Sequence, residues 1–411
     1  MLAIIVFLIG LASIGLVLWW AMSYDLPGSP GKNLEGWVNR YPAELHYVLK
    51  DAAGVDSWRF WAMIGLGDGL ACPRVRDVYE SPAGCKLIIG MLGGQSVTDW
   101  ESALDAITHG LGVPEVIIKR CAAGVIVLEV RVRDPLLEVL PMPAPEPVPD
   151  LQAVHIGMAE GEPWTVSLLY SHWMGAGATG AGKGSVLWSM LCGVAPAIHS
   201  GLVQVWGIDP KAMELAKGQA LFTRLVDDSG EEALQLLRDA VALMKKRSKS
   251  LRDRGIRKHV PTIDEPLLLV VIDEMADLIA YETDRKLRDE ALRLIQKLLS
   301  QGRAPGVGVV SFVQDPSKET VPFRQLYPGR IGLRLDEPTQ VNMVLGQGAK
   351  ARGAKCDSIP DTLPGVAYVA LDGDSAIERV RAFYPDDAAI EAIARMFPAP
   401  SNGGNDDEAV A

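Results

Sequence analysis

A glycine-rich stretch stands between an apolar run, Val166 to Tyr170, and a helix-like segment that begins at Val186. Its residues are Gly177, Ala178, Thr179, Gly180, Ala181, Gly182, Lys183, Gly184 and Ser185. Glycines permit a backbone wrap that turns successive N–H groups toward a phosphate chain, and the start of the following helix adds partial positive charge. Lys183 would then reach the β- and γ-phosphates, so the order strand, glycine loop, helix predicts a P-loop that binds ATP. The alternative is a glycine-rich linker that binds nothing.

The residue after the loop lysine departs from the usual pattern. A typical P-loop has Ser or Thr there to hold Mg²⁺, whereas this chain has Gly184 and brings Ser185 one position later. A helix turns by about 100° per residue, so the Ser185 hydroxyl points in another direction unless the turn adjusts locally. We expect Ser185 to ligate Mg²⁺ together with a carboxylate from elsewhere in the chain.

A second motif supplies that carboxylate. The apolar run Leu267 to Ile272 reads as a buried strand and ends in Asp273 and Glu274, the form of a Walker B motif. Asp273 is expected to hold Mg²⁺ directly or through water, and Glu274 is expected to polarise the water that attacks the γ-phosphate. With a P-loop upstream, this pair predicts nucleotide hydrolysis. The alternative is a strand that merely ends in a capping Asp-Glu pair.

Three further side chains are candidates for the same site. Gln314 follows the strand-like run 308–313, where its amide could contact the γ-phosphate, although a solvent-facing glutamine fits the position equally well. Arg330 is a candidate for an arginine that reaches the γ-phosphate of a neighbouring subunit, and Arg303 is the competing candidate. Each arginine also fits a structural ion pair. No His/Cys cluster suggests zinc, and no Ser-His-Asp arrangement suggests another kind of hydrolase.

Length and composition set the limits of the interpretation. A chain of 411 residues, 48% of them hydrophobic, is long enough for two or three domains with a substantial core. The net charge of −11 excludes a wholly basic nucleic-acid binder but leaves room for a local basic groove in an assembled ring. The cysteines are scattered and odd in number, which predicts reduced thiols in a cytosolic compartment. They are Cys72, Cys85, Cys121, Cys192 and Cys356.

The stretch from Leu2 to Met22 is uncharged and long enough to cross a bilayer as one helix. A cleaved signal peptide is the alternative, but no basic segment precedes the apolar run and no clear cleavage site follows it. Basic residues, Lys32 and Arg40 among them, follow the stretch, so the positive-inside rule puts the rest of the chain in the cytoplasm. We therefore expect a single-pass anchor in the cell membrane with a cytoplasmic motor domain.

The chain divides by pattern into consecutive parts. We expect the anchor at residues 1–24, a juxtamembrane helical segment at 25–70, a small αβ domain at 71–140, a Pro-rich linker at 141–150, a motor domain at 151–385, and a C-terminal helix with a disordered acidic tail at 386–411. Ser96 or Thr98 is expected to cap a helix of the small domain.

Beyond residue 151, apolar strand-like runs alternate with longer amphipathic segments, which predicts an α/β domain with a parallel sheet covered by helices. The predicted strands are Val203 to Ile208, Leu267 to Ile272, Val307 to Val313, Arg330 to Leu335 and Val366 to Leu371. Residues 231–254 have a helical period, and a cationic cluster extends from Lys245 to Lys258. Such a cluster is usually a solvated helix face, and the alternative is a patch that contacts the DNA backbone.

Several of these stretches together resemble the FtsK/SpoIIIE family of hexameric DNA-pumping ATPases. The loop resembles the family's G-T-T-G-S-G-K-S, residues 205–215 its I-D-P-K-x-x-E-L, residues 271–278 its V-D-E-x-A-D-L, residues 302–306 its R-A-A-G, and residues 314–317 its Q-R-P-S. The resemblance covers residues from about 155 to 372, and residues 73–133 also resemble the small domain that precedes the family's motor. It implies a RecA-like P-loop ATPase core that uses ATP and Mg²⁺, and a homo-oligomeric, hexameric ring that moves double-stranded DNA.

The variant Gly-Ala-Gly-Lys-Gly-Ser, with Leu345-Gly346-Gln347-Gly348-Ala349 downstream, is similar to the Tra transfer proteins of actinobacterial plasmids and integrative elements. This resemblance implies a membrane-anchored, ATP-driven translocase of double-stranded DNA in intercellular transfer (conjugation) or in segregation. The alternative is an FtsK-like ATPase that drives protein secretion of the type VII kind, although those usually carry several ATPase domains in tandem. The departures from the family pattern are Gly184, a single visible membrane helix and no winged-helix pattern after the motor.

Overall fold

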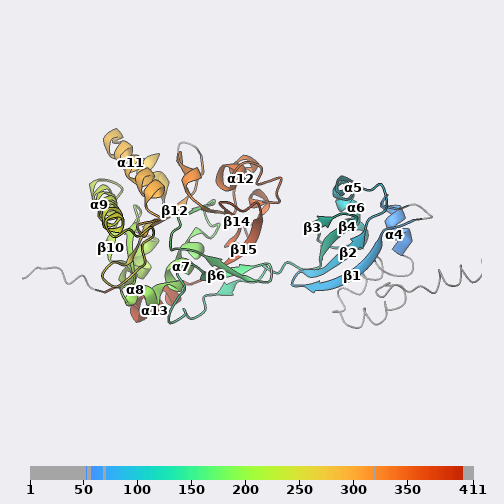
Figure 1. Cartoon of the computed structure of the whole chain (residues 1–411), viewed down its shortest axis with the longest axis horizontal. Coiled ribbons are helices and arrows are strands. Elements are labelled where there is room, and N and C mark those ends of the chain that lie inside the picture. Colours follow the sequence, from blue (N-terminus) through green and yellow to red (C-terminus); the bar gives the residue numbers. More distant parts are fainter. Residues whose placement is uncertain (1–51, 53–56, 68–70, 318–319, 401–411) are drawn as a thin grey trace, which may run out of the picture. The chain divides into compact units, whose positions relative to one another are not determined.

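The computed structural model describes residues 52, 57–67, 71–317 and 320–400 (Figure 1). The predicted anchor from Leu2 to Met22, most of the juxtamembrane segment and the acidic tail lie outside these residues. Among the described residues, no helix is long and apolar enough to cross a bilayer. The described residues form two compact units, which divide between Pro135 and Leu136. The sequence pattern placed the end of the small domain at residue 140.

The first unit is an antiparallel sheet covered by helices. Its strand order is β1-β2-β4-β3, with β1 Arg74–Ser81, β2 Gly84–Gly90, β3 Glu115–Ala122 and β4 Val125–Arg131. The helices are α4 Ser57–Met63, α5 Val97–Ser102 and α6 Leu104–Leu111. Trp61 of α4 is buried with Trp100 and Leu87, so this helix belongs to the core of the unit although the sequence placed it in the juxtamembrane segment. Ser96 caps α5 in a reciprocal pair with Asp99, as one of the two predicted caps.

The second unit contains a mixed sheet of eleven strands. Six of them are parallel neighbours, in the order β10 Arg224–Val226, β9 Val203–Ile208, β11 Leu267–Ile272, β12 Val307–Val313, β8 Trp173–Ala176 and β13 Gly329–Gly332. The sheet continues in antiparallel pairing through β14 Val366–Leu371, β15 Ile377–Tyr384, β6 Val154–Ala159 and β7 Pro163–Val166. A two-residue strand, β5 Leu140–Pro141, pairs with β15.

The expectation of a parallel sheet is therefore right for one half of the sheet and wrong for the other. A parallel neighbour needs a long crossover, usually a helix, whereas only residues 372–376 separate β14 from β15 and allow a tight antiparallel turn. Four of the five predicted strands have the observed bounds. The fifth, predicted from Arg330 to Leu335, runs from Gly329 to Gly332.

The strand before the P-loop is not where the sequence placed it. The run from Val166 to Tyr170 was expected as that strand, but β7 ends at Val166 and the strand that enters the loop is β8, Trp173–Ala176. The amides of Leu168 and Leu169 both donate to the Leu151 carbonyl at 2.9 Å. Tyr170 then has φ = 62° and turns the chain, so this apolar run is a turn that fills the core beside the sheet.

Helices cover both faces of the second sheet, and alternation along β11 shows which face each contacts. Leu268, Val270 and Ile272 pack with α9 Glu231–Asp253, α10 Met275–Ile279, α11 Arg285–Gln301 and α12 Pro338–Leu345. The other face packs with α7 Lys183–Gly193, α8 Ala195–His199 and α13 Asp387–Met396. Three short 3₁₀ helices, Leu215–Leu221, Arg324–Leu326 and Cys356–Ser358, complete the unit.

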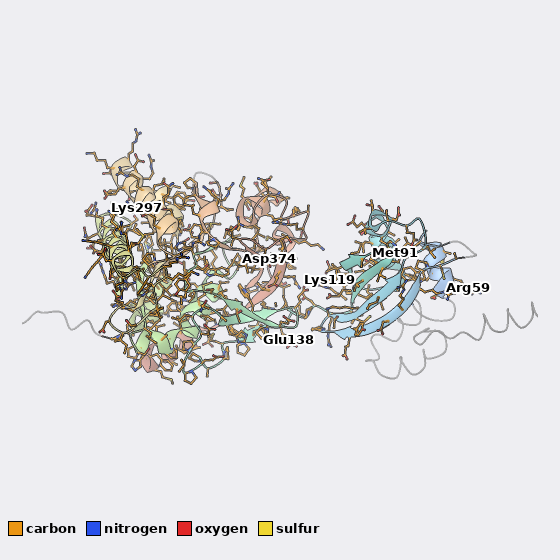
Figure 2. All side chains as sticks on the ribbon, in the orientation of Figure 1. Arg59, Met91, Lys119, Glu138, Lys297 and Asp374 are labelled. Atoms are coloured by element: carbon orange, nitrogen blue, oxygen red, sulfur yellow. The ribbon has the colours of Figure 1, made fainter. Side chains whose placement is uncertain are left out.

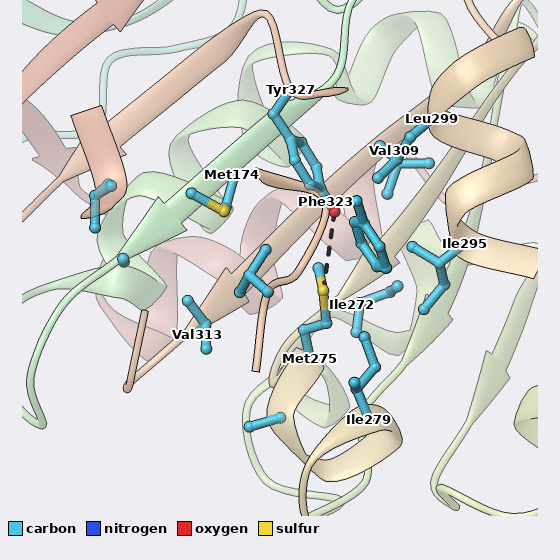
Figure 3. Packing of buried hydrophobic residues seen from close by; sticks show 14 of the residues in the cluster. Met174, Ile272, Met275, Ile279, Ile295, Leu299, Val309, Val313, Phe323 and Tyr327 are labelled. Atoms are coloured by element: carbon cyan, nitrogen blue, oxygen red, sulfur yellow. Dashed lines mark hydrogen bonds between the residues drawn. The ribbon is translucent and has the colours of Figure 1, made fainter. Parts of the chain in front are cut away.

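Figure 3 shows the packing on the first of these faces. Side chains of β12 and β8, such as Val309 and Met174, belong to one buried cluster with Ile295 of α11. The buried Tyr327 hydroxyl lies 4.0 Å from the sulfur of Met275, the residue that directly follows the Asp273-Glu274 pair. The start of α10 is thus fixed by buried contacts, which holds the preceding carboxylates in place.

Candidate active site

The glycine stretch forms a loop at the carboxyl end of β8 and leads into α7, which begins at Lys183. Gly180 and Gly182 have φ of 75° and 97°, a region that side-chained residues rarely adopt. A Cβ at position 182 would also lie 2.3 Å from the Gly365 nitrogen, so only glycine fits there. The Lys183 ammonium donates to the carbonyls of Gly177 and Ala178 at 2.8 and 3.3 Å. The loop therefore has the backbone form of a phosphate cradle with its lysine folded over it.

The carboxylate pair lies at the same edge of the sheet. Asp273 and Glu274 follow β11, and Glu274 is only 2% exposed. Its carboxylate caps α10 by accepting from the Ala276 amide at 3.3 Å, and the same oxygen accepts from the Gln314 amide at 3.4 Å. Glu274 is thereby held between the ends of β11 and β12.

Gln314 connects this carboxylate to the P-loop. β12 lies between β11 and β8 in the sheet, and Gln314 follows its last residue. The Thr179 hydroxyl donates to the Gln314 side-chain oxygen at 3.3 Å. The structure thus brings together Lys183, Asp273, Glu274 and Gln314, and their catalytic roles stay predictions.

Burial and like charges dominate the electrostatics of the site. Burial, followed by the charges of Glu214, Asp209 and Glu274, raises the pKa of Asp273 to about 7, and Lys183 opposes the shift. Burial also raises the pKa of Glu274 and lowers the pKa of Lys183, although the carboxylates of Glu274 and Asp273 act against that lowering. The site concentrates negative charge in a poorly solvated space, a situation that a divalent cation relieves.

The donor set fits Mg²⁺ bound together with a nucleotide. Magnesium usually takes one or two carboxylates, several waters and substrate phosphates rather than an all-protein cage. Among the described residues, no group of three acidic, His or Cys side chains is arranged to hold a metal by itself. Asp209 is 1% exposed, and one of its carboxylate oxygens has no hydrogen-bond partner in the described part of the chain. Asp273, with the charge of Asp209 behind it, is the residue that would hold the ion.

Glu214 is a residue of this site that the sequence did not single out. A Cβ at Gly184 would lie 2.3 Å from one Glu214 carboxylate oxygen, and that oxygen accepts from the Trp188 indole at 3.0 Å. A carboxylate therefore lies beside the position where a typical P-loop has Ser or Thr. The signal was present in the I-D-P-K-x-x-E-L-like stretch, but its contact with the P-loop helix is a tertiary feature.

Ser185 points elsewhere. Its Cβ lies 3.9 Å from the place where a side chain on Gly365 would begin, whereas position 184 faces Glu214. The two neighbouring residues of α7 thus face different parts of the structure, as the turn of about 100° per residue requires. Ligation of Mg²⁺ by Ser185 stays a prediction.

In the part of the chain that the structure describes, no hydrogen bond or ion pair joins either predicted arginine to the P-loop. Arg303 is exposed in the turn before β12, at the amino ends of the parallel strands. Arg330 is the second residue of β13, and its guanidinium lies 3.4 Å from the place of a Cβ on Gly346. The arginine that does contact the loop is Arg334, which the sequence did not single out. It donates to the Thr179 carbonyl at 2.8 Å and pairs with Asp336 at 3.6 Å.

A P-loop after β8 and a carboxylate pair after β11, a parallel strand of the same sheet, define a P-loop ATPase-like domain. Residues 153–265 match the sequence model of the FtsK/SpoIIIE family, so the chain carries an FtsK/SpoIIIE domain and the family predicted from the motifs is confirmed. The match contains the P-loop and Glu214, while Asp273, Glu274 and Gln314 follow it along the chain.

Comparison with known proteins gives relatives of the same kind. The chain is 27% identical over 339 residues to the transfer protein TraSA of Streptomyces ambofaciens, covering 75% of this chain and 78% of TraSA. It is 31% identical over 170 residues to the DNA translocase FtsK of Tropheryma whipplei, covering 36% of this chain but only 22% of that protein. The chain thus spans most of TraSA and a small part of FtsK.

Solved structures share the fold. The pCW3 conjugation coupling protein TcpA, in its monomer form with ATPγS, has a TM-score of 0.54 and 20% identity, with 82% of this chain and 98% of that chain covered. Thermomonospora curvata EccC (ATPases 2 and 3), in complex with a signal sequence peptide, has a TM-score of 0.50 and 16% identity over 65% of this chain and 53% of that one. At these identities the likeness shows the fold alone.

The contact between position 184 and Glu214 can be tested by a double-mutant cycle. Gly184→Ser should lower the free energy of unfolding by about 1–3 kcal/mol, because the new side chain overlaps the carboxylate that Trp188 holds. In a Glu214→Ala background the loss should be smaller, which gives a coupling of about 0.5–3 kcal/mol between the two changes in urea unfolding followed by tryptophan fluorescence. Ser185→Ala, one position along the helix, serves as the control and should be additive with Glu214→Ala. An equal cost of Gly184→Ser in both backgrounds would contradict the contact.

Proposed function

We propose that the chain is an ATP-driven translocase of double-stranded DNA that works in intercellular transfer (conjugation) or in DNA segregation. The observation that carries the proposal is the grouping of a P-loop, the Asp273-Glu274 pair and Gln314 at one edge of the second sheet. The P-loop belongs to the FtsK/SpoIIIE domain of the chain. The similarity to TraSA over most of its length supports a transfer role.

The residues at this edge have distinct tasks in hydrolysis. When ATP binds, the Lys183 ammonium leaves the Gly177 and Ala178 carbonyls and donates to the β- and γ-phosphate oxygens. The N–H groups of the loop donate to the same phosphate oxygens. Asp273 would hold Mg²⁺, which when bound would supply positive charge against the charge that develops on the phosphate. Glu274, fixed by the Ala276 and Gln314 amides, orients the attacking water and accepts its proton. Gln314, which contacts both Thr179 and Glu274, connects the γ-phosphate position to the end of β12.

The active assembly in this proposal is a homo-oligomeric, hexameric ring. It is anchored in the cell membrane through the apolar stretch Leu2 to Met22, with the motor domain on the cytoplasmic side. The hydropathy of that stretch and the basic residues after it support the anchor. In this proposal Arg330, or Arg303 as the competing candidate, reaches the γ-phosphate bound by a neighbouring subunit, since neither has a hydrogen bond to the P-loop among the described residues.

The ATPase rate of the purified chain, measured with and without duplex DNA, tests the proposal. We expect duplex DNA to raise the rate, while an unstructured polypeptide does not. Stimulation by a secretion-signal peptide and not by DNA would favour the alternative, an FtsK-like ATPase that drives type VII-like protein secretion.

Two variants test the site in the same assay. Glu274→Gln should keep nucleotide binding and lower turnover by about 10²–10⁴-fold, because the amide cannot accept the proton of the attacking water. Lys183→Ala should weaken nucleotide binding by roughly 10- to 100-fold, because charge-assisted hydrogen bonds to phosphate are lost. Binding is measured with a fluorescent ATP analogue. Near wild-type turnover of Glu274→Gln would rule out its assignment as the base.

Mixed assemblies test the arginine. Arg330→Ala should assemble and bind ATP but hydrolyse it on the order of 10³-fold more slowly, as expected when an arginine supplied in trans is removed. Inactive Arg330→Ala and Glu274→Gln subunits, when mixed, should recover activity, because some interfaces then combine an intact Glu274 with an intact Arg330 from the neighbour. Co-assembly without recovery would transfer the role to Arg303.

A further inference from the structure

The C-terminal end of α9 and the loop after it concentrate positive charge. Residues 245–258 include eight Lys or Arg residues and one Asp, although the whole chain has a net charge of −11. Three of the eight have structural partners: the buried Arg247 donates to the Gly306 carbonyl at 3.1 Å, Arg254 pairs with Glu265 at 3.2 Å, and the Lys258 ammonium lies 5.0 Å from the centre of the Tyr170 ring. The other five are exposed, and we call them the α9 basic surface: Lys245, Lys246, Lys249, Arg252 and Arg257.

Cations near the two ends of α9 differ in whether a carboxylate pairs with them. Lys245, Lys249 and Arg252, spaced i, i+4 and i+7, form one stripe that continues back to Arg238. Arg238 is neutralised by Glu290 at 2.8 Å and by Glu231. In the described part of the chain, no carboxylate forms an ion pair with Lys245, Lys249 or Arg252. Like charges at this spacing destabilise a helix, so the stripe is an arrangement that an anionic partner relieves.

This surface lies at the opposite edge of the sheet from the nucleotide site. Arg247 and the His259 amide, which donates to the Ala304 carbonyl at 2.8 Å, hold the end of α9 and its loop against the turn that precedes β12. The P-loop and Asp273 are at the carboxyl ends of the strands. The seven residues of β12 separate the two edges by roughly 20 Å. A ligand on the surface therefore does not compete with ATP. The helix is shown in Figure 1, and Figure 2 draws its side chains as sticks.

We propose that the α9 basic surface binds the phosphate backbone of double-stranded DNA. The stripe from Lys245 to Arg252 is roughly 10 Å long, and duplex DNA carries one negative charge per about 1.7 Å of its axis, so all three cations can face phosphates at once. Lysine and arginine contacts of this kind need no base sequence, which suits a protein that moves along a duplex. The inference rests on the proposed function and assigns its DNA partner to a particular face of this chain.

The test compares salt dependence of DNA binding in the full chain and in K245Q/K249Q/R252Q. Fluorescence anisotropy with a labelled random-sequence duplex should show a salt slope smaller by about 2.7, because each lost phosphate contact removes about 0.9 from it. Affinity near 0.1 M salt should fall on the order of 10²-fold by the same relation. Binding of a fluorescent ATP analogue should not change, since the nucleotide site lies at the other edge.

Two controls separate charge at this surface from other effects. K245R/K249R/R252K keeps all three charges and should bind DNA like the parent chain. R74Q/R76Q/K86Q removes three exposed cations from the first unit and should leave the slope unchanged. Circular dichroism checks that each variant is folded.

Every outcome decides between the proposals. A parent chain that does not bind duplex DNA contradicts the proposed function and this surface together. A parent that binds, with an unchanged slope in K245Q/K249Q/R252Q, leaves the function standing and rejects the surface. If that variant keeps DNA binding but loses binding to vesicles containing phosphatidylglycerol, the surface serves the membrane and the proposal is wrong.

Discussion

Parallel pairing of β8, β12 and β11 is the constraint on which the site depends. Because neighbouring parallel strands point the same way, the residues that follow them meet at one edge of the sheet. That geometry places Thr179, Gln314 and Glu274 within hydrogen-bond distance although they come from three distant segments. Any shift in the register of β12 would separate the P-loop from the carboxylate that is proposed to act on its nucleotide.

The two helical layers bury the strand that leads to the carboxylates and so change their electrostatics. β11 is buried on both faces, so Asp273 and Glu274 leave the sheet from an apolar environment rather than from water. Several carboxylates lie close to a single lysine at this edge. Burial and the charges of Glu214 and Asp209 together raise the pKa of Asp273. A site with this imbalance favours a ligand that brings its own cation, as Mg²⁺-ATP does.

Gly184, which departs from the usual P-loop pattern, also lies next to a carboxylate. The space that a Ser or Thr side chain would take is next to a Glu214 oxygen, and the Trp188 indole fixes that oxygen. The P-loop helix and the segment after β9 are therefore adapted to each other. An unusual residue in one motif is matched by a contact from another, which is why neither can be interpreted alone.

The sequence by itself determined the P-loop, the Asp273-Glu274 pair and the bounds of four strands, because glycine conformations and continuous apolar runs are local properties. It also located Gln314 after a strand. Only the tertiary structure decided that β8 is Trp173–Ala176, that β14 and β15 pair antiparallel, and that Glu214 and Arg334 contact the P-loop segment. These features depend on which strands become neighbours, and strand order is set by the burial of whole faces rather than by any single stretch of residues.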